Sequence, residues 1–154
     1  MTNEKPFCHL LRVRYGECDA QQVVFNSRYL DYVDVAVTEF TRALWGDYNE
    51  LLKSGYDNQV VSAKVDWKAS ARFDDVLAIY VELQRLGNTS YTLGVDIRRR
   101  ADQLALAEVS MTYVSLDARM MTKIPVPDEM RAALQKGAPG LVVDQAGVNQ
   151  MGVK

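Results

Sequence analysis

The spacing of the hydrophobic residues changes in the middle of this chain, from the period of a helix to the period of a strand. The first half carries a stripe with apolar residues three or four positions apart, at Tyr29, Val33, Val37, Phe40 and Leu44. Such a stripe is typical of a helix with one buried face. From Val61 onward, apolar and polar residues alternate, which is the period of a half-buried strand. The chain is therefore predicted to place one long helix against a sheet.

Turn-forming residues divide the chain into a predicted order of elements. We expect a strand over 7–15, a loop over 16–22, a long helix from Asn26 or Ser27 to Trp45, a short helix over 48–53, strands over 61–69, 77–83, 91–97 and 104–116, and a helix over 127–136. Consecutive strands after a helix favour an α+β fold over an alternating α/β fold. The apolar helix face is best covered by a curled antiparallel sheet of five or six strands, whose open edge favours dimerisation. We predict one domain over 1–136 and a weakly patterned tail over 137–154.

The composition excludes several kinds of chemistry. With one histidine, His9, and two cysteines, Cys8 and Cys18, a single chain cannot build a two-histidine metal site or a cysteine-rich zinc site. We therefore expect no metal site of these kinds. His9 lies in a strand pattern and is interpreted as a structural residue. Apart from His9, the chain has no histidine that could act as the base and activate Cys18 as a nucleophile. A net charge of −2 provides no general attraction to nucleic acid or to an anionic membrane.

The N-terminal residues and the cysteines bear on the compartment. The first six residues lack the apolar core of a signal peptide, and no apolar run approaches the roughly 18 residues of a membrane span. We therefore expect reduced thiols and a cytoplasmic location.

The loop before the long helix contains the candidate catalytic residue, Asp19. From the pattern alone, two interpretations stay open: Asp19 is a turn residue or remote helix cap, or it works beside the backbone N–H groups near Asn26 and Ser27. Such N–H groups, helped by the helix dipole, polarise a carbonyl and stabilise an oxyanion. A carboxylate beside them attacks the carbonyl or activates water. The second interpretation predicts acyl transfer to water.

Residues 15–31, Tyr-Gly-Glu-Cys-Asp-Ala-Gln-Gln-Val-Val-Phe-Asn-Ser-Arg-Tyr-Leu-Asp, resemble the signature of the 4-hydroxybenzoyl-CoA thioesterase branch of the hotdog-fold superfamily. Residues 69–77 and 87–91 are similar to two further turns of that family. The resemblance implies a hotdog fold that forms a homodimer or homotetramer, with active sites between subunits. It implies hydrolysis of an acyl-CoA or acyl-carrier-protein thioester to free acid and thiol, without metal or redox cofactor.

The same resemblance implies roles for two catalytic positions. Asp19 is expected to be the nucleophile or general base, and the backbone amide of Asn26 is expected to polarise the thioester carbonyl. The chain departs from the family at Gln22, where most members have glycine, so the path of the loop is in question. Many members also have histidine or tyrosine at the position of Asn26, so no side-chain role is carried over to it.

The resemblance also implies substrate contacts. The acyl group is expected near Phe25 and Tyr29, and near Val60 and Ser62 contributed by a partner chain. Arg85 and Ser90 are candidates for binding CoA. The arginines at 98–100 are a further candidate for the CoA phosphates, with an exposed strand end as the favoured alternative. The aromatic residues Phe25, Tyr29, Tyr32 and Trp67 fit a bulky acyl group or the core, and the core is the default for Tyr32 and Trp67.

Two other functions remain to be weighed. A hotdog hydratase or dehydratase would rely on a histidine, and His9 lies outside the helix start. A non-catalytic acyl-CoA-binding module would keep the groove but would not need a carboxylate at Asp19. The sequence therefore favours a thioester hydrolase.

Overall fold

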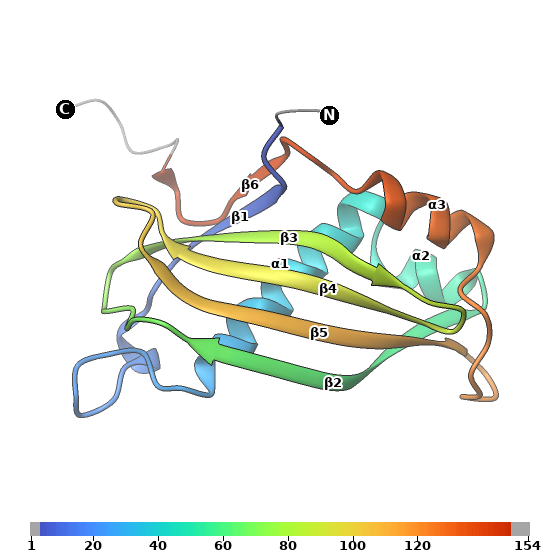
Figure 1. Ribbon diagram of the computed structural model, residues 1–154, viewed down its shortest axis with the longest axis horizontal. Coiled ribbons are helices and arrows are strands. Elements are labelled where there is room, and N and C mark those ends of the chain that lie inside the picture. Colours follow the sequence, from blue (N-terminus) through green and yellow to red (C-terminus); the bar gives the residue numbers. More distant parts are fainter. Residues whose placement is uncertain (1–3, 149–154) are drawn as a thin grey trace.

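The computed structural model describes residues 4–148, in which a curved sheet wraps around one long helix (Figure 1). The helices are α1 (Arg28–Trp45), α2 (Tyr48–Lys53) and α3 (Asp128–Lys136), and a 3-10 turn covers Tyr15–Glu17. The strands are β1 (Phe7–Arg12), β2 (Tyr56–Trp67), β3 (Val76–Leu86), β4 (Ser90–Arg99), β5 (Ala105–Asp117) and β6 (Val142–Asp144). Their order across the sheet is β2-β5-β4-β3-β1-β6. The predicted α+β hotdog arrangement is confirmed.

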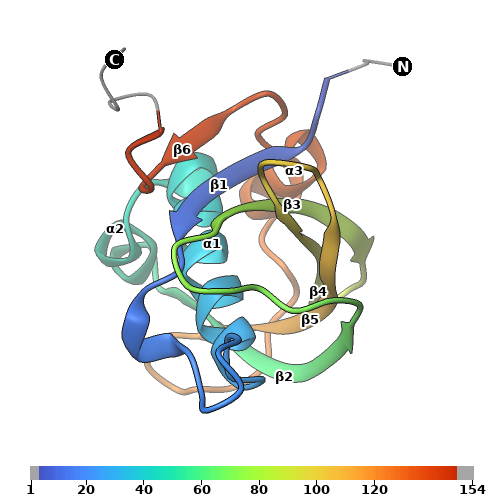
Figure 2. The same cartoon turned by 90° about the vertical axis from the view of Figure 1, so that its left-hand side faces the viewer.

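Helix α1 forms where the helical stripe was predicted and buries that stripe against the sheet. Tyr29, Val33 and Phe40 are buried, as are the residues between them on the same face. The helix packs on β1 and β3, and Figure 2 shows the sheet curving around it. Gly46 ends the helix with a φ of 87°, a backbone angle that costs a glycine little.

The core lies between α1 and the concave face of the sheet. Alternate residues of β3 and β4 point into it, including Leu77, Ile79, Leu93 and Ile97, each fully buried. Each such side chain contributes about 1.5–3 kcal/mol by leaving water. Tyr32 belongs to this core, as expected. This burial holds α1 against the sheet and so positions the loop that precedes the helix.

Strand β2 is longer and more exposed than its alternating pattern predicted. It begins at Tyr56 and forms one edge of the sheet, with a register break between Val60 and Ser62. Val61 is 53% exposed and Trp67 is 50% exposed, so the expectation that Trp67 belongs to the core is wrong for the single chain. The reason is that β2 is an edge strand: within residues 4–148 it pairs with β5 on one side and has no strand on the other.

The segment predicted to be a tail contributes the sixth strand. Residues 142–144 pair in parallel with β1, and Gln145 donates a backbone hydrogen bond to the Leu10 carbonyl at 2.9 Å. The sheet is thus mixed where an antiparallel one was expected. A strand of three residues is too short to show a period in sequence. The last part of the predicted tail, 149–154, lies outside the described residues.

Two properties of residues 4–148 bear on function. None of their helices is both long and apolar enough to cross a membrane. They also contain no group of three or more histidine, cysteine, aspartate or glutamate side chains placed to hold a metal ion.

Candidate active site

Asp19 lies on a tight turn just before α1. Its N–H donates to the Val23 carbonyl at 3.0 Å, and the N–H of Gln22 donates to the Asp19 carbonyl at 2.9 Å. Asp19 Oδ1 accepts a hydrogen bond from the N–H of Gln21 at 2.8 Å, which orients the carboxylate within the turn. Within residues 4–148, Oδ2 has no partner, and the residue is partly exposed. The turn therefore leaves one carboxylate oxygen of a partly exposed residue without a partner in the described chain.

Gln22 follows the backbone path that glycine favours. Its φ is 65°, in the left-handed region, where a residue with a Cβ atom pays about 1 kcal/mol. The glycine expected from the resemblance would adopt this angle without that cost. The substitution therefore leaves the turn in a glycine-type conformation, and the turn still presents Asp19.

Two backbone N–H groups just ahead of α1 have no acceptor in the described chain, whereas the two that follow them are hydrogen-bonded. The N–H of Arg28 donates to the Phe25 carbonyl at 2.9 Å, and the N–H of Tyr29 donates to the Asn26 carbonyl at 3.4 Å. No acceptor in the described chain takes the N–H of Asn26 or Ser27, and the Ser27 side chain makes no capping bond. Donors at the positive end of a helix dipole are suited to an oxyanion.

The two segments 15–31 and 69–77, which both resemble family signatures, meet at this site. The Tyr29 hydroxyl accepts a hydrogen bond from the N–H of Ala71 at 3.0 Å, and the Ala71 carbonyl accepts one from the N–H of Val24 at 2.9 Å. Ala71 therefore holds both the end of the loop and the first turn of α1. Tyr29 is buried by this contact, whereas Phe25 is 51% exposed and accessible to a substrate.

The remaining predicted substrate residues lie elsewhere in the same chain. Arg85 donates from Nη2 to Ser90 Oγ at 2.9 Å, at the turn between β3 and β4. The Asp19 turn is held at the other end of β3, whose 11 residues span about 35 Å. Val60 and Ser62 lie exposed midway along β2. One chain thus brings Arg85 and Ser90 together, but not with Asp19.

The other polar candidates are engaged in the fold. Arg98 pairs with Asp96 at 2.7 Å, and Arg99 pairs with Asp102 at 2.8 Å, so these arginines already have carboxylate partners. His9 is fully buried, and burial lowers the pKa of its imidazole, which is therefore neutral near pH 7. It has no exposed atom with which to reach a substrate, and the structural interpretation of His9 stays a prediction.

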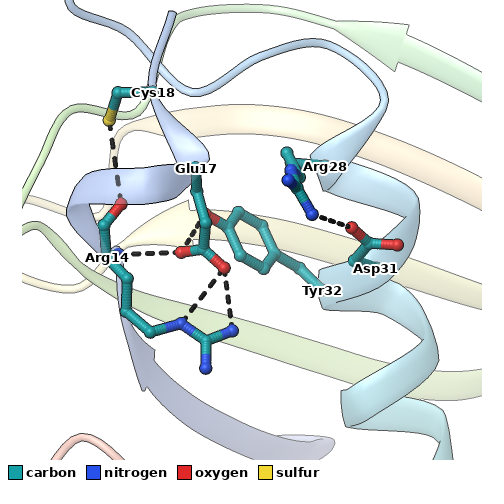
Figure 3. A network of polar contacts seen from close by, with 6 residues as sticks. All are labelled: Arg14, Glu17, Cys18, Arg28, Asp31 and Tyr32. Atoms are coloured by element: carbon teal, nitrogen blue, oxygen red, sulfur yellow. Dashed lines mark hydrogen bonds and ion pairs between the residues drawn. The ribbon is translucent and has the colours of Figure 1, made fainter.

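The sequence reasoning missed Glu17, two residues before Asp19. Its carboxylate is buried, 7% exposed, and accepts hydrogen bonds from Arg14 and from the Tyr32 hydroxyl (Figure 3). Burial alone would raise the pKa of Glu17, but these hydrogen bonds outweigh it and lower the pKa. The same hydrogen bond and burial raise the pKa of Tyr32. An acidic residue three positions after an arginine suggests a surface ion pair, so only the contact with α1 reveals the burial.

Comparisons with known proteins place this arrangement in a family. Residues 13–134 match the model of the thioesterase-like superfamily. The acyl-CoA thioesterase YbgC of Haemophilus influenzae is 28% identical over 128 residues, covering 82% of this chain and 93% of its own length. A thioesterase-superfamily structure from Jannaschia sp. has a TM-score of 0.81 at 23% identity, covering 90% of this chain and 99% of the other. A Staphylococcus aureus protein solved in complex with CoA has a TM-score of 0.81 at 10% identity, covering 88% and 85%.

A curved sheet wrapped around one long helix is the hotdog fold, which the Jannaschia structure shares. Because the family model covers most of its length, the chain belongs to the thioesterase-like superfamily. The resemblance in residues 15–31 therefore pointed to the correct family, and the predicted class of enzyme, a thioesterase, is confirmed.

Proposed function

We propose that the protein hydrolyses the thioester of an acyl-CoA to a free acid and a thiol, with Asp19 as the catalytic carboxylate. The observation that carries the proposal is that one loop supplies both the unpartnered Oδ2 of Asp19 and the unpaired N–H groups of Asn26 and Ser27. The name of the Haemophilus relative, an acyl-CoA thioesterase, supports CoA as the thiol. Acyl-carrier-protein substrates and the cytoplasmic location stay predictions.

The proposed chemistry uses a carboxylate and backbone dipoles. The thioester carbonyl oxygen accepts a hydrogen bond from the N–H of Asn26, and the α1 dipole stabilises the oxyanion that forms. Asp19 either takes a proton from the attacking water or attacks the carbonyl carbon itself, giving an anhydride that water opens. In both routes the thiolate leaves and takes up the proton that water released.

A homodimer formed along β2 is proposed to complete the site. The β2 edge is open and carries exposed Val60 and Val61, whereas β6 covers part of the other edge of the sheet. Two antiparallel β2 strands place the start of one beside the end of the other. The β3–β4 turn of the second copy, with Arg85 and Ser90, then lies at the same end as the first copy's Asp19. Such pairing supplies the CoA contacts that one chain keeps at the far end of β3 from Asp19.

The acyl group is proposed to lie against Phe25, with Val60 and Ser62 of the second copy on its other side. Phe25 is the exposed aromatic residue next to Asn26, and an exposed ring in a loop offers a flat apolar surface. This favours an aromatic or bulky acyl group. A direct contact between Tyr29 and the substrate stays a prediction, since its hydroxyl is bonded to Ala71.

Thiol release from a panel of aliphatic and aromatic acyl-CoA esters, and from an acyl-carrier protein, tests the proposal. We expect the wild type to release thiol and Asp19→Asn to lose about 10³-fold in kcat/KM, because the amide is neither a base nor a nucleophile. The matched control is Asp31→Asn, which removes an exposed carboxylate paired with Arg28 in the first turn of α1. This control should retain wild-type turnover.

Two outcomes would refute the proposal. Hydrolysis by Asp19→Asn at the wild-type rate would exclude the carboxylate from the chemistry. A wild type that binds CoA esters in calorimetry but cleaves none of them would instead favour the non-catalytic binding module.

A further inference from the structure

Glu17 is the buried carboxylate nearest in sequence to the proposed catalytic residue, and the proposed chemistry does not use it. We propose that Glu17 is a positioning residue, which holds the Asp19 turn and the start of α1 in a fixed relation to each other. The inference rests on the proposed function, since it concerns the geometry of the same reaction.

The Glu17 side chain joins the loop to the helix. Its Oε1 accepts the N–H of Arg14 at 2.7 Å and the hydroxyl of Tyr32 at 2.9 Å. Its Oε2 accepts from Arg14 Nη2 at 2.8 Å and from Nε at 3.2 Å. Tyr32 is a buried residue of α1, one turn beyond the helix start (Figure 3). The carboxylate is therefore fixed from both sides, by the segment before the turn and by the helix after it.

The Glu17 backbone makes a second link to the same site. Its carbonyl accepts the N–H of Phe25 at 3.0 Å, and the next residue, Cys18, pairs with Val24. Glu17 thus contacts the residue directly before Asn26 and lies two residues before Asp19. A shift of Glu17 would move the carboxylate and the N–H donors relative to each other.

The energetics of Glu17 fit a positional role as well as a stabilising one. Burying a carboxylate is costly, and apolar residues that fill the same space often stabilise a fold equally well. The Glu17 side chain is 8% exposed, while its partner Arg14 is 79% exposed, so the cost of desolvation in this ion pair falls on Glu17. Because hydrogen bonds depend on direction, those of the Glu17 carboxylate fix the positions of Arg14 and Tyr32 relative to each other.

The test compares Glu17→Gln with the same control, Asp31→Asn. Glutamine has the same size, but its NH₂ group cannot accept the hydrogen bonds that one carboxylate oxygen accepts. We expect kcat on the best acyl-CoA ester to fall about 10- to 100-fold in Glu17→Gln, with KM changed less than about 3-fold, as for a misplaced catalytic group. Asp31→Asn should keep both constants. A folded Glu17→Gln with wild-type kcat would overturn the inference.

Two additions keep the test decisive. If Glu17→Gln does not fold, Tyr32→Phe removes only the helix-side donor and should still lower kcat more than it raises KM; unchanged kcat would overturn the inference. If the wild type cleaves no thioester, the proposed function fails, and hydrogen exchange of the Phe25 amide, which donates to the Glu17 carbonyl, becomes the readout. Faster exchange in Glu17→Gln but not in Asp31→Asn would support the positioning role, and equal exchange would refute it.

Discussion

The N–H of Ala71 donates a hydrogen bond to the Tyr29 hydroxyl, so removing the hydroxyl oxygen is predicted to lower the stability of the protein by a definable amount. In Tyr29→Phe, the N–H of Ala71 loses its acceptor while Ala71 stays fully buried. An unsatisfied buried N–H costs about 1–3 kcal/mol. At about 2–4 °C per kcal/mol for a domain of this size, we expect the melting temperature to fall by about 4–8 °C for a central cost near 2 kcal/mol.

Tyr48→Phe is the matched control for this prediction. Tyr48 donates its hydroxyl to Asp57 at 2.9 Å on the surface, where water replaces the lost partner. The control should shift the melting temperature by less than about 2 °C, since surface changes cost within about 0.5 kcal/mol. Thermal unfolding followed by circular dichroism measures both variants. An equal shift in the two proteins would refute the reasoning that the Tyr29–Ala71 bond stabilises the start of α1.

Tyr29→Phe also separates two roles of Tyr29. If Tyr29 acts through Ala71, the loss of stability accompanies a modest effect on turnover at temperatures where the variant is folded. If its hydroxyl also contacts the substrate, KM rises in addition to the fall in melting temperature. Steady-state kinetics beside the melting curves distinguish the two.

Two further predictions follow from charge and from the open edge. The pKa of Glu17 is lower in the fold than its ordinary value of 4.5, so its stabilising contribution is present above about pH 4.5 and is lost as the pH falls through the folded-state pKa. In urea unfolding from pH 6 to 3, the free energy of unfolding should therefore fall less in Glu17→Gln than in the wild type. Equal losses would contradict this. The lowered pKa of His9 adds to the acid loss in both proteins, so their difference isolates Glu17. Val61→Asp places a charge on the exposed β2 edge. It should convert the proposed dimer or tetramer to smaller species in light scattering, with loss of turnover; an unchanged mass would exclude that edge as the interface.

The sequence was sufficient for the elements whose signal is local. The stripe from Tyr29 to Phe40 specified α1, and alternation specified the four long strands, since both periods report which side chains face the core. Residues 15–31 placed Asp19 on a turn ahead of the helix, and the structure has that turn. These features depend on neighbours within a few residues, so one sequence contains them.

The tertiary structure decided which polar groups are buried and which apolar groups are exposed. Glu17 is buried because Tyr32 of α1 meets it, and Tyr29 is an anchor because Ala71 arrives from another segment. Trp67 is exposed at the end of the edge strand β2, and residues 142–144 form a strand because β1 offers them an open edge. Each outcome depends on contacts between residues distant in the chain. A hydrophobic period contains no record of such contacts, because it reports the face of an element and not its partner.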